Sequence, residues 1–548
     1  MRDYSTKTKI KKAVFSKAHM KTAARNTLGP LAKKSAALIT LAALFTSSAA
    51  PLMAAPPDDR HHSEDAVRHI KHIIVIYQEN WSFDSLYGQF PGANGLQSAF
   101  DTLSQYDKST NYTSLIYRTP RPLNNGSPDP NFPASPDGNL ALWSDHGVAL
   151  PPFPFDFTNY IDATAKTGDI VHRFYTEQLQ IDNGALEAKK NDLGKFVTWS
   201  DNPGLVLSYL DATNLPEGQL AQQYTLCDKF FHSAYGGSFL NHQWLISAQS
   251  PPWTTAIPSG WQSSYNPTTK TLHDNQLTID GQYGVNTIQP AKAPFSPSTT
   301  NPALRLLINN TDPNAPGYVV TLGNRLDDAG ISWKWYSGGW NVALQNNTQA
   351  ANDPSIIFQF HHQPFAYYTK YAPFLTAPNA NYTTSPPLNP DTTGPNAHLQ
   401  DETQFFADLQ SLSADRFPAV VFIKFAGIDN EHPGYTDVVR GQQHVADIVH
   451  AVQNSRIWND TAIIVTYDEN GGRWDHIAPP VRADGWGTGV RVPTLVISPF
   501  ARQGFIDHHE YETVSILKLI EFRFNLARLG QRDADPAVND LVDAFAMH

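Results

Sequence analysis

The chain has 548 residues, of which 41% are hydrophobic and 17% charged, a composition that is typical of globular proteins and excludes disorder along the whole chain. Its length permits a large core, in one α/β domain with insertions or in several domains. The formal net charge is −11, although the first residues are basic. The single cysteine, Cys227, excludes an intramolecular disulfide and lies in an apolar stretch, so we expect a buried structural thiol.

Residues 1–55 have the pattern of an export signal. Ten Lys and Arg residues and one acidic residue lie within residues 1–35, and an uncharged run of small and apolar residues follows at 36–50. We predict a signal peptide over residues 1–55, cleaved near Ala55 or alternatively near Ala50, and hence an exported protein that is periplasmic or secreted. An uncleaved membrane anchor is the alternative for this segment. Beyond it, the absence of any run of 18 uncharged apolar residues predicts no stable membrane span.

Residues 56–548 are predicted to form a single domain with insertions. The segments near 100–160, 250–300 and 375–400 are rich in Pro, Asn, Ser, Thr and Gly and have weak periodicity. We expect them to be long loops or a small β subdomain laid over the core. Neither a GxxxxGKS/T phosphate loop nor a GxGxxG motif is present, so nucleotide binding by these routes is unsupported, and we expect no nucleic-acid partner.

Four short apolar runs predict buried strands. Each is rich in Val and Ile rather than alternating with polar residues, as expected for strands that are covered on both faces of a parallel sheet. The runs are residues 72–77 (HIIVIY), 419–425 (AVVFIKF), 462–467 (AIIVTY) and 492–497 (VPTLVI). Helical patterns lie at 403–412, 441–453 and 516–526. This alternation predicts an α/β fold with a central, mostly parallel sheet flanked by helices.

Polar side chains follow three of these strands, at the points where the strands end. Glu79 and Asn80 follow the first strand, Asp468 and Glu469 follow the third, and a cluster that contains His432 follows the second. Because the carboxyl ends of parallel strands share one edge of the sheet, we expect these side chains to converge. One acidic pair alone would be an ordinary turn or helix cap, but two pairs after matched strands favour a site for a divalent cation, which in turn suits a phosphate oxygen.

A serine is the candidate nucleophile. Ser238 follows Gly236 and Gly237 and precedes an apolar, helix-like segment at 239–248. The backbone N–H groups at a helix N-terminus favour an anion such as phosphate. Alternatively, Ser238 is only the N-cap of that helix, which is a common role for serine. The segment lacks the GxSxG pattern, so a lipase-type triad is not indicated.

Together, these motifs resemble the phosphoesterase family that contains bacterial phospholipases C and acid phosphatase A. HIIVIYQENWSFDSLYG, at residues 72–88, is similar to the ENxSFD start of that family, and YDENGGRWDHIAPP, at 467–480, is similar to its YDExxGxxDHV block. GGSFLNH, at 236–242, resembles the nucleophile segment of the acid phosphatase A branch. The resemblance extends from about residue 70 to residue 526 and implies an α/β fold like that of alkaline phosphatase.

The resemblance implies a site for one divalent metal ion. The metal ligands that it implies are Glu79, Asn80, Ser238, Asp468 and Glu469, with Ser238 also acting as the nucleophile.

The resemblance also implies histidines around the phosphate. His432 matches one of them, either His361 or His362 matches a second, and His146 matches a third. An imidazolium ring can stabilise phosphoryl oxygens and protonate the leaving oxygen.

Further residues are expected to support this site. Asp475 and His476 are either ligands of a second metal ion or supporting contacts, and the resemblance to one-metal enzymes favours support. Asn241 is a further supporting candidate. The family often has arginine where this chain has Trp81, which cannot form a salt bridge.

Three functions remain open from the sequence. The first is a metal-dependent phosphoric monoester hydrolase, an acid phosphatase, which acts on a phosphorylated small molecule through a phosphoserine intermediate. The second is a phospholipase C that acts at a phospholipid headgroup. The third is a non-catalytic periplasmic protein that binds phosphate or a metal ion.

Overall fold

The computed structural model describes residues 59–101, 105, 154–159, 162–182, 193–202, 205–374, 388–389 and 397–547. These residues all belong to one unit, Pro56–His548. The predicted signal segment, residues 1–55, and most of the predicted insertions near 100–160 and 375–400 lie outside the described residues.

Eight strands form the central sheet, in the order β13-β12-β14-β1-β15-β16-β4-β17. Their bounds in chain order are β1 His72–Gln78, β4 Thr225–Cys227, β12 Trp333–Ser337, β13 Leu399–Asp401, β14 Val420–Lys424, β15 Thr461–Tyr467, β16 Thr494–Ile497 and β17 Phe505–Asp507. β1 lies between β14 and β15 and pairs with both in parallel. All residues of β1, β14, β15 and β16 are buried, so the prediction of strands covered on both faces is confirmed.

One strand runs against the expected direction. The run at 492–497 was grouped with the parallel strands, but β16 pairs antiparallel with both β15 and β4. The described segment between β15 and β16 contains no helix, so the chain returns without the helical crossover that a parallel neighbour needs. A continuous Val- and Ile-rich run indicates a buried strand but not its direction.

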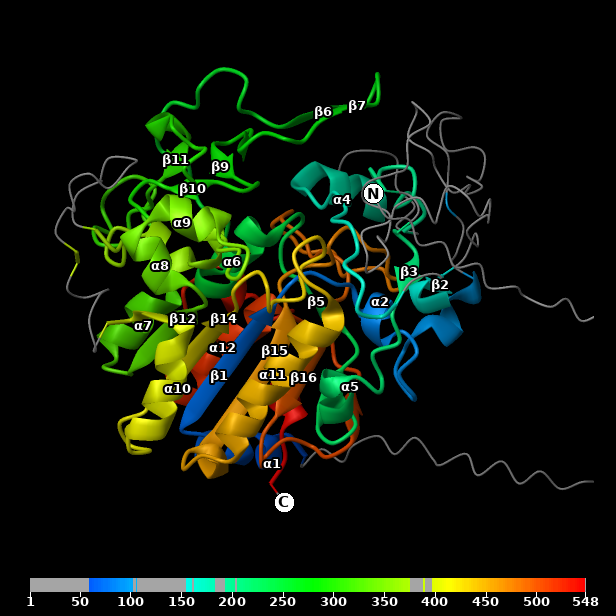
Figure 1. Cartoon of the computed structure of the whole chain (residues 1–548), viewed down its shortest axis with the longest axis vertical. Helices are drawn as coiled ribbons and strands as arrows, with labels where there is room; N and C mark the ends of the chain where they lie inside the picture. The colour runs from blue at the N-terminus through cyan, green and yellow to red at the C-terminus, as the bar shows by residue number, and fades with distance from the viewer. Residues whose placement is uncertain are drawn as a thin grey trace, which may run out of the picture. The chain divides into compact units, whose positions relative to one another are not determined.

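Helices cover both faces of the sheet. Their bounds are α1 Asp59–His69, α2 Phe83–Tyr87, α4 Phe174–Ile181, α5 Pro216–Ala221, α6 Ser238–Ser247, α7 Leu322–Asp328, α8 Trp340–Gln345, α9 Asn347–Asn352, α10 Glu402–Ser411, α11 Val438–Gln453 and α12 Thr513–Phe524. The three predicted helices correspond to α10, α11 and α12. Figure 1 shows α11 in front of the central strands and α12 behind them.

The sequence of α11 explains both its start and its buried face. The Asp437 side chain caps the helix by accepting a hydrogen bond from the Arg440 N–H at 2.9 Å. Val445, Val449 and Val452 are buried and recur at spacings of three and four residues, so they form one apolar stripe. This stripe holds α11 against the sheet.

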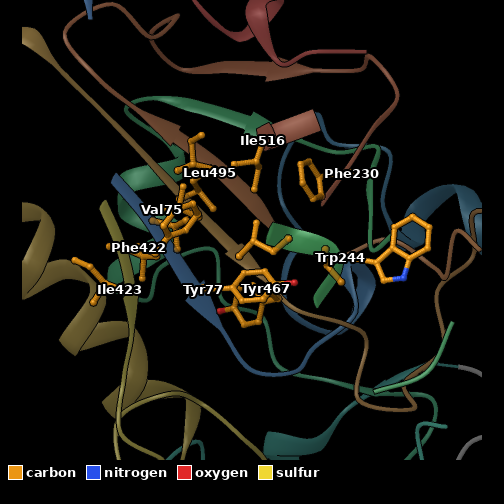
Figure 2. Close-up of a cluster of buried hydrophobic side chains, with 14 of the residues drawn as sticks. Val75, Tyr77, Phe230, Trp244, Phe422, Ile423, Tyr467, Leu495 and Ile516 are labelled. Carbon is orange, nitrogen blue, oxygen red and sulfur yellow. The ribbon is translucent and has the colours of Figure 1, made fainter. Parts of the chain in front are cut away.

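The core lies between the sheet and these helices. Figure 2 shows side chains from several elements meeting there, including Val75 and Tyr77 of β1, Phe422 of β14, Leu495 of β16 and Ile516 of α12. All five are fully buried. Each such side chain contributes about 1.5–3 kcal/mol of burial free energy, so this cluster firmly fixes the strands whose ends carry the polar residues.

The insertion near 250–300 forms short β ladders, as one of the sequence interpretations expected. Its strands are β6 Ser264–Asn266, β7 Thr271–His273, β8 Thr278–Ile279, β9 Tyr283–Gly284 and β10 Gln289–Pro290, which pairs with β11 Arg305–Leu306. Figure 1 shows β6 and β7 away from the central sheet. The other short strands are β2 Phe155–Asp156, β3 Ser208–Tyr209, β5 Phe230–Phe231 and β18 Tyr511–Glu512.

Two smaller observations complete the fold. Cys227 is a free, buried thiol in β4, as predicted, and burial raises its pKa well above the ordinary value. Among the described residues, no helix is both long and apolar enough to cross a membrane.

Candidate active site

The sheet brings the predicted polar residues together at one edge. Glu79 and Asn80 follow β1, and Asp468 and Glu469 follow β15, its parallel neighbour. All four are fully buried. The parallel register therefore places the Glu79–Asn80 pair beside the Asp468–Glu469 pair, as the sequence predicted.

Glu79 has contacts on both of its carboxylate oxygens. Ser238 Oγ donates to Glu79 Oε2 at 3.1 Å, and His432 Nε2 lies 3.8 Å from the same oxygen. Lys424 Nζ lies 2.6 Å and His362 Nε2 2.9 Å from Oε1. Glu79 thus joins the candidate nucleophile to three basic side chains from other parts of the chain.

The charges around Glu79 determine its ionisation. Burial alone would raise its pKa, but His362 and Lys424 outweigh burial and hold the pKa well below the ordinary value. Burial and the charge of Glu79 raise the pKa of Asp468 well above the ordinary value, and burial is also the largest cause of the raised pKa of Glu469. A cation placed between these carboxylates would favour their ionised forms.

Two buried oxygens support such a cation. Asn80 Nδ2 donates to Glu469 Oε1 at 2.9 Å, which leaves Asn80 Oδ1 without a hydrogen-bond partner among the described residues. Asp468 Oδ1 accepts from the Glu469 N–H at 2.9 Å, and Asp468 Oδ2 likewise lacks a hydrogen-bond partner in the described part of the chain. Unpaired oxygens are costly to bury, and hard oxygen donors suit a divalent ion. The residues therefore fit a metal ion.

Ser238 is the first residue of α6 and not its N-cap. Gly237 is the N-cap, and no side chain caps the helix, so the alternative role considered for Ser238 is wrong. The hydroxyl is instead bonded to Glu79. Gly236 adopts φ +94°, and a Cβ there would lie 2.7 Å from the Phe174 backbone nitrogen, so both the left-handed backbone and the tight packing require glycine.

Three histidines line a cleft beside Ser238. The cleft has a volume of about 500 Å³, and His172, His361 and His432 are among its lining residues. His361 and His432 were candidates from the sequence. His146, the third candidate, lies outside the described residues.

His172 was missed by the sequence analysis. It immediately precedes Arg173, the N-cap of α4, and it follows none of the predicted strands, so the strand-end pattern could not identify it. A Cβ on Gly237 would lie 3.0 Å from the His172 ring, which shows how closely this histidine packs against the turn before Ser238.

Backbone contacts orient two of the cleft histidines. His172 Nδ1 lies 2.5 Å from Ile170 O, and His432 Nδ1 lies 2.5 Å from Pro433 O. In each ring, Nδ1 must carry the proton that the carbonyl accepts. The remaining nitrogen faces inward: His172 Nε2 is 3.4 Å from Glu469 Oε1, and His432 Nε2 is 3.8 Å from Glu79 Oε2.

Burial lowers the pKa values of the other site histidines. Burial lowers the pKa of His362 to about 4 and lowers that of His361 well below the ordinary value. His242 of α6 also has a strongly lowered pKa because of burial, and its ring stacks on His362 with 4.9 Å between the centroids. These three rings pack against one another beside Glu79, and His362 also contacts the Glu79 carboxylate.

Lys424 was also missed. It is the last residue of β14, it is fully buried, and it forms the shortest of the Glu79 contacts. Its signal in the sequence was a lysine at the end of an otherwise apolar strand, VVFIK. Lysine is almost never fully buried unless it is paired, so this residue predicted a buried partner.

The predicted supporting residues fall into two groups. Asn241 holds the turn before Ser238, because its Nδ2 donates to Ala234 O at 3.1 Å and to Gly236 O at 3.2 Å. Asp475 and His476 belong to a separate cluster around Arg491. Arg491 Nε lies 2.9 Å from Asp475 Oδ1.

Trp81 occupies the position where arginine is common in the family that the sequence resembles. Its Nε1 donates to Glu431 O at 3.1 Å. The guanidinium of Arg473 lies over the indole ring, 3.7 Å from its centroid. Trp81 therefore forms a cation–π contact with Arg473, which lies in the loop after β15.

Comparisons with known proteins identify the family of the chain. The Phosphoesterase family model matches residues 70–527. Phospholipase C A of Mycobacterium tuberculosis is 24% identical over 505 residues, which cover 87% of this chain and 77% of that protein. Non-hemolytic phospholipase C of Burkholderia pseudomallei is 24% identical over 498 residues, which cover 84% of this chain and 56% of that protein.

A solved structure of a protein in the alkaline phosphatase superfamily from Vibrio parahaemolyticus is also similar. It is 11% identical, with 60% of this chain and 65% of that chain covered and a TM-score of 0.29. The family match covers most of the chain and includes every strand end that carries a site residue. The chain therefore belongs to the Phosphoesterase family and is a hydrolase that acts on phosphoester bonds.

Proposed function

We propose that the protein is an exported acid phosphatase, a metal-dependent hydrolase of phosphoric monoesters that forms a phosphoserine at Ser238. The observation that carries the proposal is the Ser238 hydroxyl bonded at 3.1 Å to an ionised, buried Glu79 beside the cleft. Export rests on the predicted signal peptide.

Residues of this chain can carry out both halves of the reaction. Glu79 orients the Ser238 hydroxyl, and Ser238 Oγ attacks phosphorus as the bond to the leaving oxygen breaks, with the hydroxyl proton released to water. His172 or His432 donates an Nε2 proton to the leaving oxygen. In the second half, water attacks the phosphoserine and gives its proton to the same histidine. As the phosphoserine bond breaks, Ser238 Oγ takes up a proton from water, and phosphate leaves.

The charge of the site supports one divalent ion. Glu79, Asp468 and Glu469 together carry three negative charges when ionised, and Lys424 supplies one positive charge in contact with them. One divalent ion would neutralise the remaining two charges. The proposed ligands are these three carboxylates with Asn80 Oδ1 and Ser238 Oγ. Such an ion would polarise a phosphoryl oxygen and lower the pKa of the serine hydroxyl.

The lining of the cleft supports a water-soluble monoester. Polar side chains from several segments line it, including Asp169, Arg173, Asp201, Asn275 and Gln359. Among the described residues, none of the exposed large apolar side chains belongs to this lining. A lipid acyl region would need an apolar contact surface, whereas a polar leaving group matches these side chains.

Phospholipase C activity is the second candidate. The similar proteins from Mycobacterium tuberculosis and Burkholderia pseudomallei carry that name. The substrate would then be a phospholipid headgroup, with the acyl chains outside the cleft. Membership of a phosphoesterase family leaves the third hypothesis, a non-catalytic binding protein, without support.

A substrate panel tests the proposal. The full chain, before and after chelation with EDTA, is assayed between pH 4 and 8 on p-nitrophenyl phosphate and on phosphatidylcholine vesicles, with Ser238→Ala as the control. We expect acid-favoured hydrolysis of the aryl phosphate that EDTA abolishes and a divalent ion restores. Hydrolysis of the vesicles alone would support phospholipase C, and binding of phosphate without turnover would contradict both enzymes.

A further inference from the structure

A buried acid lies behind the turn that presents Ser238. Glu177 of α4 is fully enclosed, and its Oε2 accepts a hydrogen bond from the Gly236 N–H at 2.6 Å. Its Oε1 lies 2.8 Å from His232 Nε2 and accepts from the Val490 N–H at 3.4 Å. Both carboxylate oxygens are therefore used, and one of them bonds directly to the residue two positions before Ser238.

The turn is held from a second direction by Asn241. Asn241 Oδ1 accepts from the Ala234 N–H at 3.1 Å, and its Nδ2 donates to Gly236 O at 3.2 Å. Gly236 therefore has its N–H fixed by Glu177 and its carbonyl fixed by Asn241. With φ at +94°, Gly236 has a conformation that is open to glycine but rarely to other residues, and the two contacts hold it there.

The same short segment also positions a cleft histidine. His172 stands immediately before Arg173, the N-cap of α4, and Glu177 lies within the first turn and a half of that helix. A Cβ on Gly237 would lie 3.0 Å from the His172 ring and 3.0 Å from the His172 backbone carbonyl oxygen. The N-terminal end of α4 thus connects the Gly236–Gly237 turn to His172. The hydrogen bond from the Gly236 N–H to Glu177 joins the turn to this helix.

We propose that Glu177 is a positioning residue that holds the Gly236–Gly237 turn and so fixes the distance between Ser238 Oγ and the phosphate subsite. This inference rests on the proposed role of Ser238. Glu177 does not touch the cleft: it acts through Gly236. A displacement of the nucleophile by about 1 Å can cost about a hundredfold in rate, so loss of this contact should reduce kcat far more than it changes KM.

Three variants separate positioning from general stability. Glu177→Ala removes the acceptor, and Glu177→Asp keeps the charge but withdraws the carboxylate by one methylene. Glu177→Gln keeps an oxygen for the Gly236 N–H and can donate its amide hydrogen to a neutral His232. The matched controls are Asp408→Ala and Asp408→Asn, since Asp408 is also buried and pairs with Lys334 at 2.7 Å, without contacting the turn.

The readouts are kcat, KM and the rate of phosphoserine formation on p-nitrophenyl phosphate, together with the midpoint of thermal unfolding and the metal content. We expect a loss of kcat of about 10- to 100-fold for Glu177→Ala and Glu177→Asp, with KM changed less than threefold and metal content unchanged. Glu177→Gln should stay within about threefold of wild type. The Asp408 variants should lower the unfolding midpoint but keep kcat.

Two results would overturn the inference. One is wild-type kcat in Glu177→Asp or Glu177→Ala, and the other is an equal loss of kcat in Asp408→Ala. If Glu177→Ala does not fold, Glu177→Asp decides alone. Full activity of Ser238→Ala would instead refute the proposed function, so the two failures are distinguishable.

Discussion

Among single residues, Glu79 and Asp468 offer the most direct test of the metal site. Replacing either by its amide, Glu79→Gln or Asp468→Asn, removes one of the three site carboxylates that the proposed ion neutralises. We expect each variant to lose affinity for a divalent ion by more than about tenfold and to purify without stoichiometric metal. Elemental analysis of the purified proteins measures this.

Asp475→Asn serves as the control for that experiment. Asp475 is equally buried, but it pairs with Arg491 in the separate cluster that also includes Asp84 and His476. We expect this variant to keep its metal. Retention of metal by Glu79→Gln and Asp468→Asn together with loss from Asp475→Asn would move the site to the Arg491 cluster.

A further test at the residue scale asks whether His172 or His146 is the third histidine around the phosphate. His172 faces Glu469 from the cleft wall, whereas His146 was selected only through a resemblance. We propose the phosphate-binding role for His172 and expect His172→Asn to lower kcat/KM by about 10²–10⁴, the usual contribution of a general acid or base. The measurement is steady-state kinetics on one aryl phosphate, and a loss confined to His146→Asn would favour His146.

At the scale of elements, the turn before α6 is the structural feature most sensitive to substitution. Gly236→Ala would place a methyl group in a left-handed backbone and 2.7 Å from the Phe174 nitrogen. We expect a loss of about 1–3 kcal/mol in unfolding free energy and a large loss of kcat, because the turn must move away from α4. Denaturant unfolding and kinetics measure the two effects.

Gly330→Ala is the control that measures the destabilisation caused by the left-handed backbone alone. Gly330 has φ +66°, and nothing lies within 4 Å of the position of its Cβ. We expect a destabilisation of about 1 kcal/mol from the left-handed conformation, with no change in kcat. If Gly236→Ala and Gly330→Ala changed the unfolding free energy and kcat equally, the packing of α4 against the Gly236 turn would contribute to neither quantity.

A strand was predictable from the sequence when most of its residues belonged to one continuous apolar run. β1, β14, β15 and β16 were predicted because each has four to seven residues rich in Val, Ile or Leu. β4, β13 and β17 have only three residues each, and β12 reads WKWYS, so their composition does not distinguish them from loops. Their strand identity comes from pairing partners that are distant in the chain.

The same distinction explains the site. Glu79, Asn80, Asp468 and Glu469 were predictable because they follow recognisable strands, and a parallel sheet brings such ends together. His172, Lys424 and Glu177 were not, because their roles depend on contacts with residues far away in the sequence. Local patterns contain no information on such contacts unless a residue type is out of place, as Lys424 is.

At the scale of the whole molecule, a buried carboxyl pair makes stability depend on pH. Glu217 of α5 and Glu431, in the loop between β14 and α11, both bond to the Tyr467 hydroxyl, at 3.2 and 2.7 Å. Burial raises the pKa of Glu217 from 4.5 to about 7 and raises that of Glu431 well above the ordinary value. Folding therefore favours the protonated pair, which joins three segments of the fold.

The sign of the effect follows from the raised pKa of Glu217. Its contribution to stability is complete below about pH 4.5 and is lost as pH rises through about 7, so it can reach about 3 kcal/mol. We expect Glu217→Gln to flatten the pH dependence of the unfolding free energy between pH 4.5 and 7, measured by urea titration. An identical slope in wild type and variant would show that Glu217 does not titrate in this range.

The central claim is covalent catalysis by Ser238, and trapping the intermediate tests it most directly. The wild-type protein is mixed with p-nitrophenyl phosphate at acidic pH, quenched in acid within the first turnover, and digested for mass spectrometry, with Ser238→Ala treated in parallel. The account predicts phosphate on the peptide that contains Ser238, at up to one group per chain, and none in Ser238→Ala, which should also lack turnover. Phosphate trapped on another residue, or turnover by Ser238→Ala at the wild-type rate, would contradict it.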